Sequence, residues 1–453
     1  MNLSAISSSD RRRFLGATAS AFAALAASGC TIRTRGADGA PGRARQPASF
    51  AGYGALAPDP AGLIDLPPGF SYRVISRLGD DMDDGGTVPD RADGMGCFDL
   101  GGGEIALVRN HELQPQHDAG GPIAKGFGKR NGVYVPGGTT TIVLDAETLA
   151  VKRQFRSLGG TIRNCAGGVT PWGSWLSCEE APTGPGQRYG DGLERNHGWV
   201  FEVPASARGL VDPVPLTAMG RFNHEAAAVD PATGIVYMTE DRDDSVLYRF
   251  LPKVPGKLAE GGRLQAMVIE GLADTRNWNS PAMPVGKRYH VSWVDLDNVE
   301  APKDDLRQRA AAKGAALVAR GEGLHMGESA VFACCTSGGA KQLGQILKLT
   351  PGLAGSPDMV ELFFESESTA QFNYGDNLCV APNGHLIVCE DQYTDVVDNH
   401  IRGITPQGSA YDVARLTAQT ELAGACFSPD GKWLFVNVYS PTATLAITGP
   451  WAA

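Results

Sequence analysis

The sequence has no dense run of basic residues, and this absence argues against nucleic-acid binding. Its 40 lysines and arginines are outnumbered by 50 aspartates and glutamates, which gives a formal net charge of -10 at pH 7. A nucleic-acid-binding protein usually gathers positive charge on one surface to neutralise phosphates. The acidic excess instead favours a protein that binds cations.

Long apolar runs are also missing after residue 30, so no later segment is predicted to span a membrane. The N-terminus carries Asp-Arg-Arg-Arg-Phe-Leu-Gly at 10–16, followed by the short apolar run Ala17–Gly29. This pattern resembles a twin-arginine signal, so we expect a signal peptide at residues 1–30, the twin-arginine machinery as a partner, and a periplasmic or extracellular protein. A lipoprotein cleavage box ending at Cys30 is an equal alternative to plain cleavage, and acylation there would anchor the chain to a membrane.

Residues 31–50 are rich in Gly, Pro, Arg and Ala and predict a flexible linker, which leaves residues 51–453 as the folded domain. The whole chain contains 58 glycines and 29 prolines, so many tight turns and short strands are expected rather than a helical bundle. With 42% hydrophobic residues the chain can bury a large core.

A divergent hairpin repeats along the chain. Each copy has an apolar strand, a turn with Pro and Gly, and a second strand that ends in a polar side chain. Three copies are plain and three are looser: 229–241, 380–391 and 427–437, then 98–112, 167–180 and 324–337. Six such units predict an all-β protein, a β-propeller of six blades with loop and short helical insertions.

The polar residues repeat with the strands. Five candidate ligands lie about 15 residues before a hairpin end: Cys165, Glu225, Glu322, Asp376 and Glu421. Across a hairpin with a short turn, both ends of this interval lie at the same end of the ladder. Acids from most blades should therefore converge on one mouth of the central channel, where only cations could keep them ionised.

No serine or threonine stands in an obvious nucleophile motif, and no close set of Cys and His predicts a structural zinc site. The hairpin 164–180 carries Cys165 at its start and Glu179 and Glu180 at its end, around a predicted turn at 170–173. A soft thiolate beside hard carboxylates suits iron with a neighbouring calcium.

Several stretches resemble the PhoX-type alkaline phosphatases in the same order along nearly the whole mature chain. The most specific is Asn-Cys-Ala-Gly-Gly at 164–168, with Thr-Pro-Trp-Gly at 170–173 and Cys-Glu-Glu at 178–180. The others are 109–112, 220–226, 320–323, 376–377 with 390–391, 421–424, 427–431 and 447–451. The chain is shorter than the long-form members, and His325–Glu328 replaces the usual aromatic residue near a glycine turn.

The resemblance implies an exported phosphatase that hydrolyses phosphate monoesters, with iron (Fe3+) and calcium as cofactors and a metal-bound oxide or hydroxide as nucleophile. By resemblance, Cys165 is a thiolate ligand of iron, and Glu225 and Glu322 bind iron or calcium. Five more residues fall near calcium: Glu180, Asp376, Asn377, Glu390 and Glu421. Arg320 would hold the substrate phosphate, and Arg320 and Cys165 are the two residues for which the resemblance implies a catalytic role. The choices between Glu179 and Glu180, and between Glu390 and Asp391, stay open.

Two other functions remain open at this point. A calcium-dependent propeller esterase or lactonase would use carboxylates but no iron, and its activity would survive Cys165→Ser. A non-catalytic extracytoplasmic binding propeller would hold calcium for rigidity and show no phosphatase activity with any metal.

Overall fold

The computed structural model describes residues 50, 52–352, 355–392 and 394–451. The signal peptide predicted at 1–30 and the linker predicted at 31–50, apart from Phe50, lie outside the described residues. Residues from Phe50 onward form one compact unit. Among the described residues, no helix is long and apolar enough to cross a membrane.

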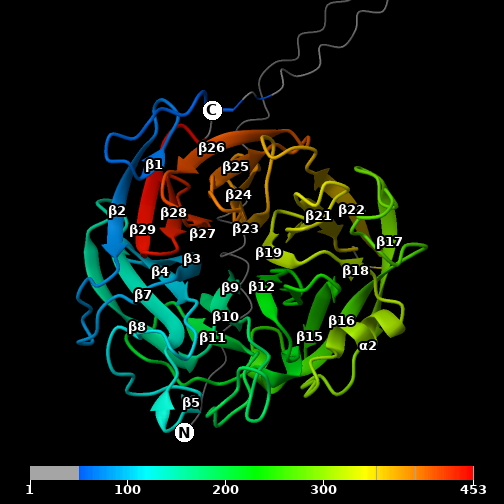
Figure 1. Ribbon diagram of the computed structural model, residues 1–453, viewed down its shortest axis with the longest axis horizontal. Helices are drawn as coiled ribbons and strands as arrows, with labels where there is room; N and C mark the ends of the chain where they lie inside the picture. The colour runs from blue at the N-terminus through cyan, green and yellow to red at the C-terminus, as the bar shows by residue number, and fades with distance from the viewer. Residues whose placement is uncertain (1–49, 51, 353–354, 393, 452–453) are drawn as a thin grey trace, which may run out of the picture. The chain divides into compact units, whose positions relative to one another are not determined.

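Six innermost hairpins stand around a central axis (Figure 1). Each innermost strand contacts the next along the chain, and the last contacts the first, so the ring is closed. Numbered in chain order, the blades begin with β3 (Ala92–Gly101), β9 (Asn164–Val169), β12 (His224–Val229), β19 (Gly321–Met326), β23 (Gly375–Val380) and β27 (Leu422–Phe427). The second strands are β4 (Glu104–His111), β10 (Ser174–Glu179), β13 (Val236–Glu240), β20 (Val331–Cys335), β24 (Leu386–Glu390) and β28 (Trp433–Val438).

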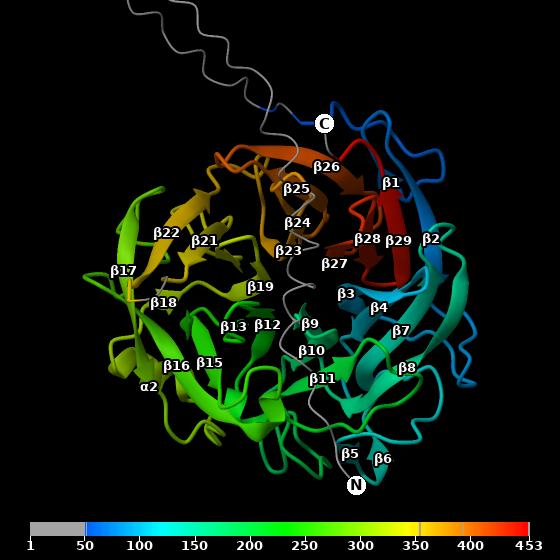
Figure 2. The same cartoon turned by 180° about the vertical axis from the view of Figure 1, so that it is seen from behind.

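The outer strands complete antiparallel sheets, seen from the other side in Figure 2. They are β7 (Gly137–Asp145), β8 (Val151–Thr161), β11 (Val200–Pro204), β15 (Tyr248–Pro252), β16 (Gly262–Ile269), β21 (Gln345–Thr350), β22 (Asp358–Glu365), β25 (His400–Ile404), β26 (Ala410–Leu416) and β29 (Ala443–Thr448). Strand β17 (Arg288–Asp295) pairs with both β16 and β22 and joins the third and fourth blades into one nine-stranded sheet.

The predicted all-β propeller is confirmed. Six hairpins surround the axis, whereas the hydrogen-bonded sheets of four or more strands number four in the described chain, because β17 fuses two blades and the second blade has three strands. Among residues 50, 52–352, 355–392 and 394–451, helical structure is limited to α2 (Leu306–Ala312) and the short 3-10 turns Thr217–Met219 and Leu258–Glu260. Two small ribbons pair β5 (Lys129–Arg130) with β6 (Val133–Tyr134) and β14 (Ser245–Val246) with β18 (Leu317–Val318).

The ring is closed by a strand from the N-terminal side. Strand β2 (Ser71–Arg77) pairs antiparallel with β29 and becomes the outer strand of the sixth blade. Strand β1 (Ile64–Asp65) adds to β26 in the fifth blade. Edge-to-face aromatic contacts join the same regions, since the ring of Phe70 lies 4.7 Å from that of Trp451.

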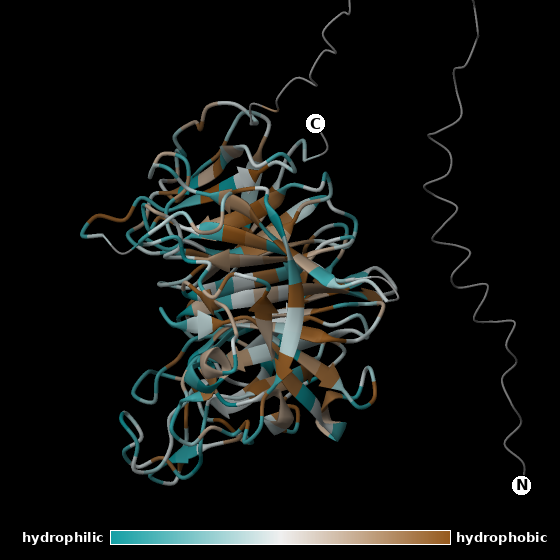
Figure 3. Cartoon of the chain, turned by 90° about the vertical axis from the view of Figure 1, so that its right-hand side faces the viewer, coloured by the Kyte–Doolittle hydropathy of each residue, from teal (hydrophilic) through white to brown (hydrophobic). Residues whose placement is uncertain are grey.

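The hairpin turns follow the glycine pattern of the sequence. In the three plain copies, the turn glycines Gly234, Gly384 and Gly431 have φ of 73°, 81° and 72°, a region that disfavours residues with a Cβ. Between the turns, Val, Ile and Leu side chains pack between neighbouring blades, and hydrophilic residues concentrate in the connecting loops (Figure 3). The blades are therefore rigid supports for side chains at the ends of their innermost strands.

Candidate metal centre

Each innermost hairpin contains a register shift, a β-bulge, close to the central axis. The innermost strand has two consecutive residues where its partner has one. A bulge of this kind turns side chains away from the regular alternation and is common beside functional sites. The same irregularity in six blades therefore places six pairs of residues beside the channel.

In five blades the two bulge residues face different cavities. The first residue of each pair lines a polar cavity of about 350 Å³: Asp93, Cys165, Glu225, Glu322 and Asp376. The second residue lines an apolar cavity of about 280 Å³: Gly94, Ala166, Ala226, Gly323 and Asn377. In the sixth blade the bulge comes one residue later, at 424–425, and Glu421 reaches the polar cavity instead.

The backbone before these ligands is held by one hydrogen bond per blade. The amide that follows the second strand donates to a carbonyl just before the innermost strand. The six pairs are Glu112 to Arg91, Glu180 to Arg163, Asp241 to Asn223, Thr336 to Arg320, Asp391 to Tyr374, and Tyr439 to Glu421. Arg91, Arg163, Arg320 and Tyr374 all have φ between 45° and 57°, a strained conformation for residues with a side chain.

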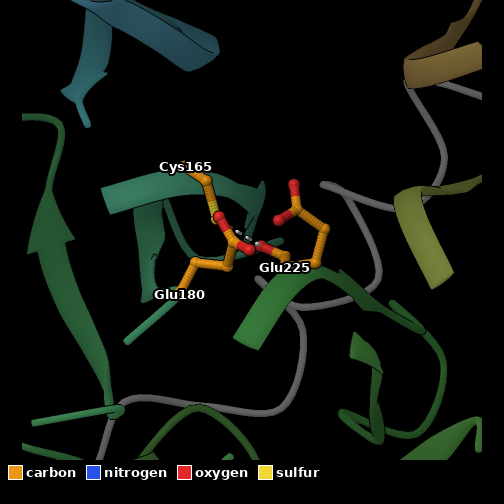
Figure 4. A group of neighbouring side chains, drawn as sticks. All are labelled: Cys165, Glu180 and Glu225. Atoms are coloured by element: carbon orange, nitrogen blue, oxygen red, sulfur yellow. Dashed lines mark hydrogen bonds between the residues drawn. The ribbon is translucent and has the colours of Figure 1, made fainter. Parts of the chain in front are cut away.

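The acidic side chains form three overlapping groups, within each of which the ligand atoms lie within 4.8 Å of one another. The groups are Cys165 with Glu180 and Glu225, Glu225 with Glu322 and Asp376, and Asp376 with Asp391 and Glu421. Figure 4 shows the first, with the sulfur and both carboxylates directed toward a common point. Because Glu225 and Asp376 each belong to two groups, the seven residues form one continuous acid cluster.

This acid cluster is electrostatically unfavourable without a counter-charge. Burial raises the pKa of Glu180 to about 8, with Asp241 and Glu112 adding to the shift and Arg163 opposing it. Burial and the neighbouring Asp391 raise the pKa of Asp376 to about 7. Burial also raises the pKa of Glu225, Glu322 and Glu421 well above the usual range, and nearby carboxylates reinforce each shift. Bound cations would remove this repulsion, so the donors fit metal ions.

The thiol of Cys165 lies in this acidic environment rather than in an apolar core. The predicted turn joins β9 to β10, with the amide of Gly173 donating to the carbonyl of Thr170 at 3.1 Å. Burial and the carboxylates of Glu225 and Glu180 raise the pKa of Cys165 well above its usual value. A thiol in such surroundings becomes a thiolate only if a cation binds it.

Two arginines flank the acid cluster. Arg320 donates to both carboxylate oxygens of Asp241, at 2.7 and 3.0 Å, and to Glu322 at 3.0 Å. Arg163 donates to Glu112 at 2.7 Å and to Glu180 at 2.5 Å. Guanidinium groups in this position match the oxygens of a phosphate as well as those of a carboxylate.

Seven of the residues selected from the sequence come together in the polar cavity: Cys165, Glu180, Glu225, Arg320, Glu322, Asp376 and Glu421. The structure also places the two residues of the first open choice in different surroundings. Glu180 faces the cavity, whereas Glu179 is fully buried and accepts hydrogen bonds from the backbone and from His197.

Two selected residues lie elsewhere. Glu390 is fully buried outside the acid cluster, where it accepts hydrogen bonds from Arg402 and from the amides of Asn373 and His400, and Asp391 takes its place in the cavity. The physical reason is strand alternation, which sends consecutive side chains to opposite sides. Asn377, the second bulge residue, faces the apolar cavity and accepts from the Gly424 amide at 2.7 Å.

Sequence reasoning missed Asp93 and Arg163, although a signal for both exists. The triplets 91–93, 163–165 and 320–322 read Arg-Ala-Asp, Arg-Asn-Cys and Arg-Gly-Glu, with an arginine two residues before a ligand type. Aligning the hairpins on this triplet would have placed Asp93 beside Cys165 and Glu322. Burial, with Asp376 and Glu112 nearby, raises the pKa of Asp93 well above its usual range.

A family model described as alkaline phosphatase PhoX matches residues 51–442. The chain belongs to the PhoX alkaline phosphatase family. This membership confirms the resemblance read from the sequence and identifies the protein as a phosphoric ester hydrolase of the alkaline phosphatase type. A search of curated proteins found no match.

Among solved structures, one similar to this PhoX-family chain is Pseudomonas fluorescens PhoX in complex with vanadate, a transition state analogue. The two share 19% identity over 88% of this chain and 97% of that one, with a TM-score of 0.66, which supports the shared fold. A gluconolactonase from Xanthomonas campestris has 14% identity over 89% of this chain and 99% of its own, with a TM-score of 0.40. A likeness at that level adds nothing to the assignment.

Proposed function

We propose that this PhoX-family protein is an exported, metal-dependent phosphatase that hydrolyses phosphate monoesters at its acid cluster. One observation carries the proposal: three overlapping ligand groups and two arginines converge on a single cavity at one mouth of the propeller. Such a site can hold several cations and one phosphate group at the same time.

The donor chemistry suggests which metal each group would hold. Cys165, Glu180 and Glu225 offer a sulfur with two carboxylates, a set that suits iron. Asp376, Asp391 and Glu421 offer only oxygen, which suits calcium. When bound, these ions would neutralise phosphoryl oxygens and lower the pKa of coordinated water.

The chain's own arginines would orient the substrate. Asp241 holds the plane of the Arg320 guanidinium through two hydrogen bonds, so its direction is set before a substrate arrives. Arg163 is held in the same way from the second blade, by Glu112 and Glu180. A phosphate between them would receive charge-assisted hydrogen bonds from two directions.

Cys165 is better suited to bind metal than to attack phosphorus. Its carboxylate neighbours disfavour the thiolate, which is the nucleophilic form. Tyr439, another hydroxyl or thiol group in the cavity, donates to Glu112, and burial raises the pKa of this phenol. We therefore propose that Cys165 contributes to catalysis as a metal ligand and not as the nucleophile.

The location is proposed from the sequence pattern alone. Residues 1–30 would direct export by the twin-arginine pathway, and acylation of Cys30 would anchor the protein to a membrane. Replacing Arg11, Arg12 and Arg13 by lysine should retain the precursor in the cytoplasm. Fractionation that finds this variant exported normally would contradict the twin-arginine assignment.

The function is tested by metal analysis and by p-nitrophenyl phosphate hydrolysis, with and without a chelator. We expect iron and calcium in the active protein, loss of iron and activity in Cys165→Ser, and a KM raised about 100-fold in Arg320→Ala. Cys97→Ser is the matched control, because Cys97 lies on β3 outside the polar cavity. Calcium-dependent turnover that survives Cys165→Ser would favour the esterase alternative, and no turnover by fully metal-loaded protein would favour a binding propeller.

A further inference from the structure

A second, larger cavity opens beside the acid cluster. Its volume is about 1000 Å³, and Arg163 and Glu180 line both this cavity and the polar cavity. If phosphate binds at the acid cluster, as the proposed function requires, the remainder of the ester can extend into this larger space. We refer to it as the leaving-group cleft.

Two linked segments build one wall of the leaving-group cleft. The β5–β6 ribbon supplies Arg130, and the loop between β10 and β11 supplies Arg188 and Tyr189. The Nε of Arg130 donates to the backbone carbonyl of Asp191 at 2.9 Å, and the amide of Asn131 donates to Gly192 at 2.9 Å. The ribbon and the loop therefore form one connected wall.

The loop is also fastened to the body of the propeller. The hydroxyl of Thr183 donates to the Arg188 carbonyl at 2.7 Å, and the buried Arg221 donates to the side chain of Gln187 at 2.8 Å. The guanidinium of Arg188 lies 4.7 Å from the ring centroid of Tyr189, a cation–π contact. Arg188 is thus exposed, but these contacts restrain its position.

Arg130 and Arg188 differ from the other arginines of the leaving-group cleft. Arg163 has two carboxylate partners, and Arg242 lies 3.8 Å from Asp304. Within the described parts of the chain, neither Arg130 nor Arg188 has an ion pair with a carboxylate. The carboxylates of Asp191 and Asp304 also line the cleft, but Asp304 is shared between Arg242 and Arg307.

We infer that Arg130 and Arg188 bind a second anionic group on the leaving group, so the preferred substrates are phosphate esters that also carry a distal carboxylate or phosphate. The inference rests on the proposed function and deepens it. Two guanidinium groups without carboxylate partners, at the wall of a cleft that opens onto the acid cluster, suit an anion at the far end of the substrate.

The test compares sorbitol 6-phosphate with 6-phosphogluconate, which differ by one distal carboxylate and share a primary alkyl phosphate. We expect the wild-type protein to favour 6-phosphogluconate by about tenfold or more in kcat/KM. Each substitution, Arg130→Ala or Arg188→Ala, should reduce this preference about threefold to fivefold through KM, as expected of exposed charge pairs. The double variant should lose the preference, and 0.5 M NaCl should weaken it in the wild type.

Arg195→Ala is the matched control, because this substitution removes the same charge from the same loop, and Arg195 does not line the cleft. It should keep the wild-type preference, and Arg188→Lys should retain part of it. A wild-type enzyme that hydrolyses both esters equally, or a double variant that keeps the preference, overturns the inference alone. If neither ester is hydrolysed by metal-loaded protein, the proposed function fails and the inference falls with it.

Discussion

Neighbouring carboxylates at the ends of three strands have opposite environments. Glu179, Glu240 and Glu390 are the last residues of β10, β13 and β24, and each is fully buried with hydrogen-bond donors around it. The next residues along the chain, Glu180, Asp241 and Asp391, face the polar cavity, where they crowd against other acids. One step along the backbone thus separates a structural carboxylate from a candidate metal ligand.

The difference lies in what surrounds each oxygen rather than in how acidic the segment is. Glu390 receives an arginine Nε at 2.8 Å and two backbone amides, so its charge is stabilised by the protein itself. Members of the acid cluster face one another, and Arg163 and Arg320 offset only part of their charge, so the remainder must be stabilised by bound cations. Four experiments test whether the two kinds of carboxylate differ in this way.

The largest effect is expected from Glu225→Gln, because Glu225 belongs to two ligand groups. The neutral amide should lose at least one metal ion and lower kcat about 1,000-fold, a loss typical of removing a central electrostatic contact. Metal analysis and steady-state kinetics measure both. Glu270→Gln is the matched control, because the Glu270 side chain is exposed and belongs to none of the three ligand groups. Full metal content with near-normal kcat in Glu225→Gln would contradict the ligand assignment.

The next effect contrasts Glu390→Ala with Asp391→Ala in metal-free protein. Removing Glu390 leaves two amides and the buried Arg402 without this acceptor, so the free energy of unfolding should fall by about 3 kcal/mol. Removing Asp391 relieves repulsion on Asp376 and Glu421 and should leave the metal-free protein at least as stable. Denaturant unfolding measures both free energies. Equal destabilisation by the two substitutions would contradict the proposed difference between Glu390 and Asp391.

Metal-free protein should also become less stable as pH rises. The folded pKa values of Glu180, about 8, and Asp376, about 7, lie above their usual values, so the folded state holds protons that the unfolded chain releases. The stability contributed by these groups is therefore greatest below about pH 4 and is lost steadily as pH rises from about 4 to about 8. Thermal unfolding with a chelator should show this slope, and added iron and calcium should remove it. A metal-free protein that gains stability from pH 5 to 8 would contradict the expectation.

The smallest effect is expected from Asn377→Ala. Its side chain accepts from the Gly424 amide at 2.7 Å and donates to Asp376 at 3.1 Å, so its loss should cost about 1 to 2 kcal/mol of stability. Metal content should persist and kcat should fall less than tenfold, since Asp376 keeps its charge but loses one orienting contact. Loss of a metal ion in this variant would instead make Asn377 a ligand.

Much of the fold was predictable because each repeated hairpin has a recognisable turn sequence. Glycine in the left-handed region and alternating apolar residues mark the hairpins whatever their insertions are. The fusion of two blades by β17 was not predictable, since its sequence differs little from that of any other outer strand and its partners lie far apart in the chain.

The site was predictable to the level of the strand end and no further. To choose Glu180 over Glu179, or Asp391 over Glu390, one must know which residue is the last to pair in the ladder. A shift of one residue exchanges the two sides of a strand. The position of Asn377 was not predictable for a related reason: the bulge directs it to the apolar cavity although it directly follows Asp376. Bulges depend on contacts between blades and leave little trace in a single sequence.

The closure of the ring by β2 has a consequence for how the protein is made. Strand β2 belongs to the first tenth of the folded domain, and its partner β29 is the last strand described. A ribosome must therefore release nearly the whole chain before the sixth blade can form. Asp93 comes near Glu421, the residue just before β27, only where β3 and β27 meet. The ligand group of Asp376, Asp391 and Glu421 can therefore be completed only near the end of synthesis. A chain cut short before residue 421 should thus bind fewer metal ions than the whole domain.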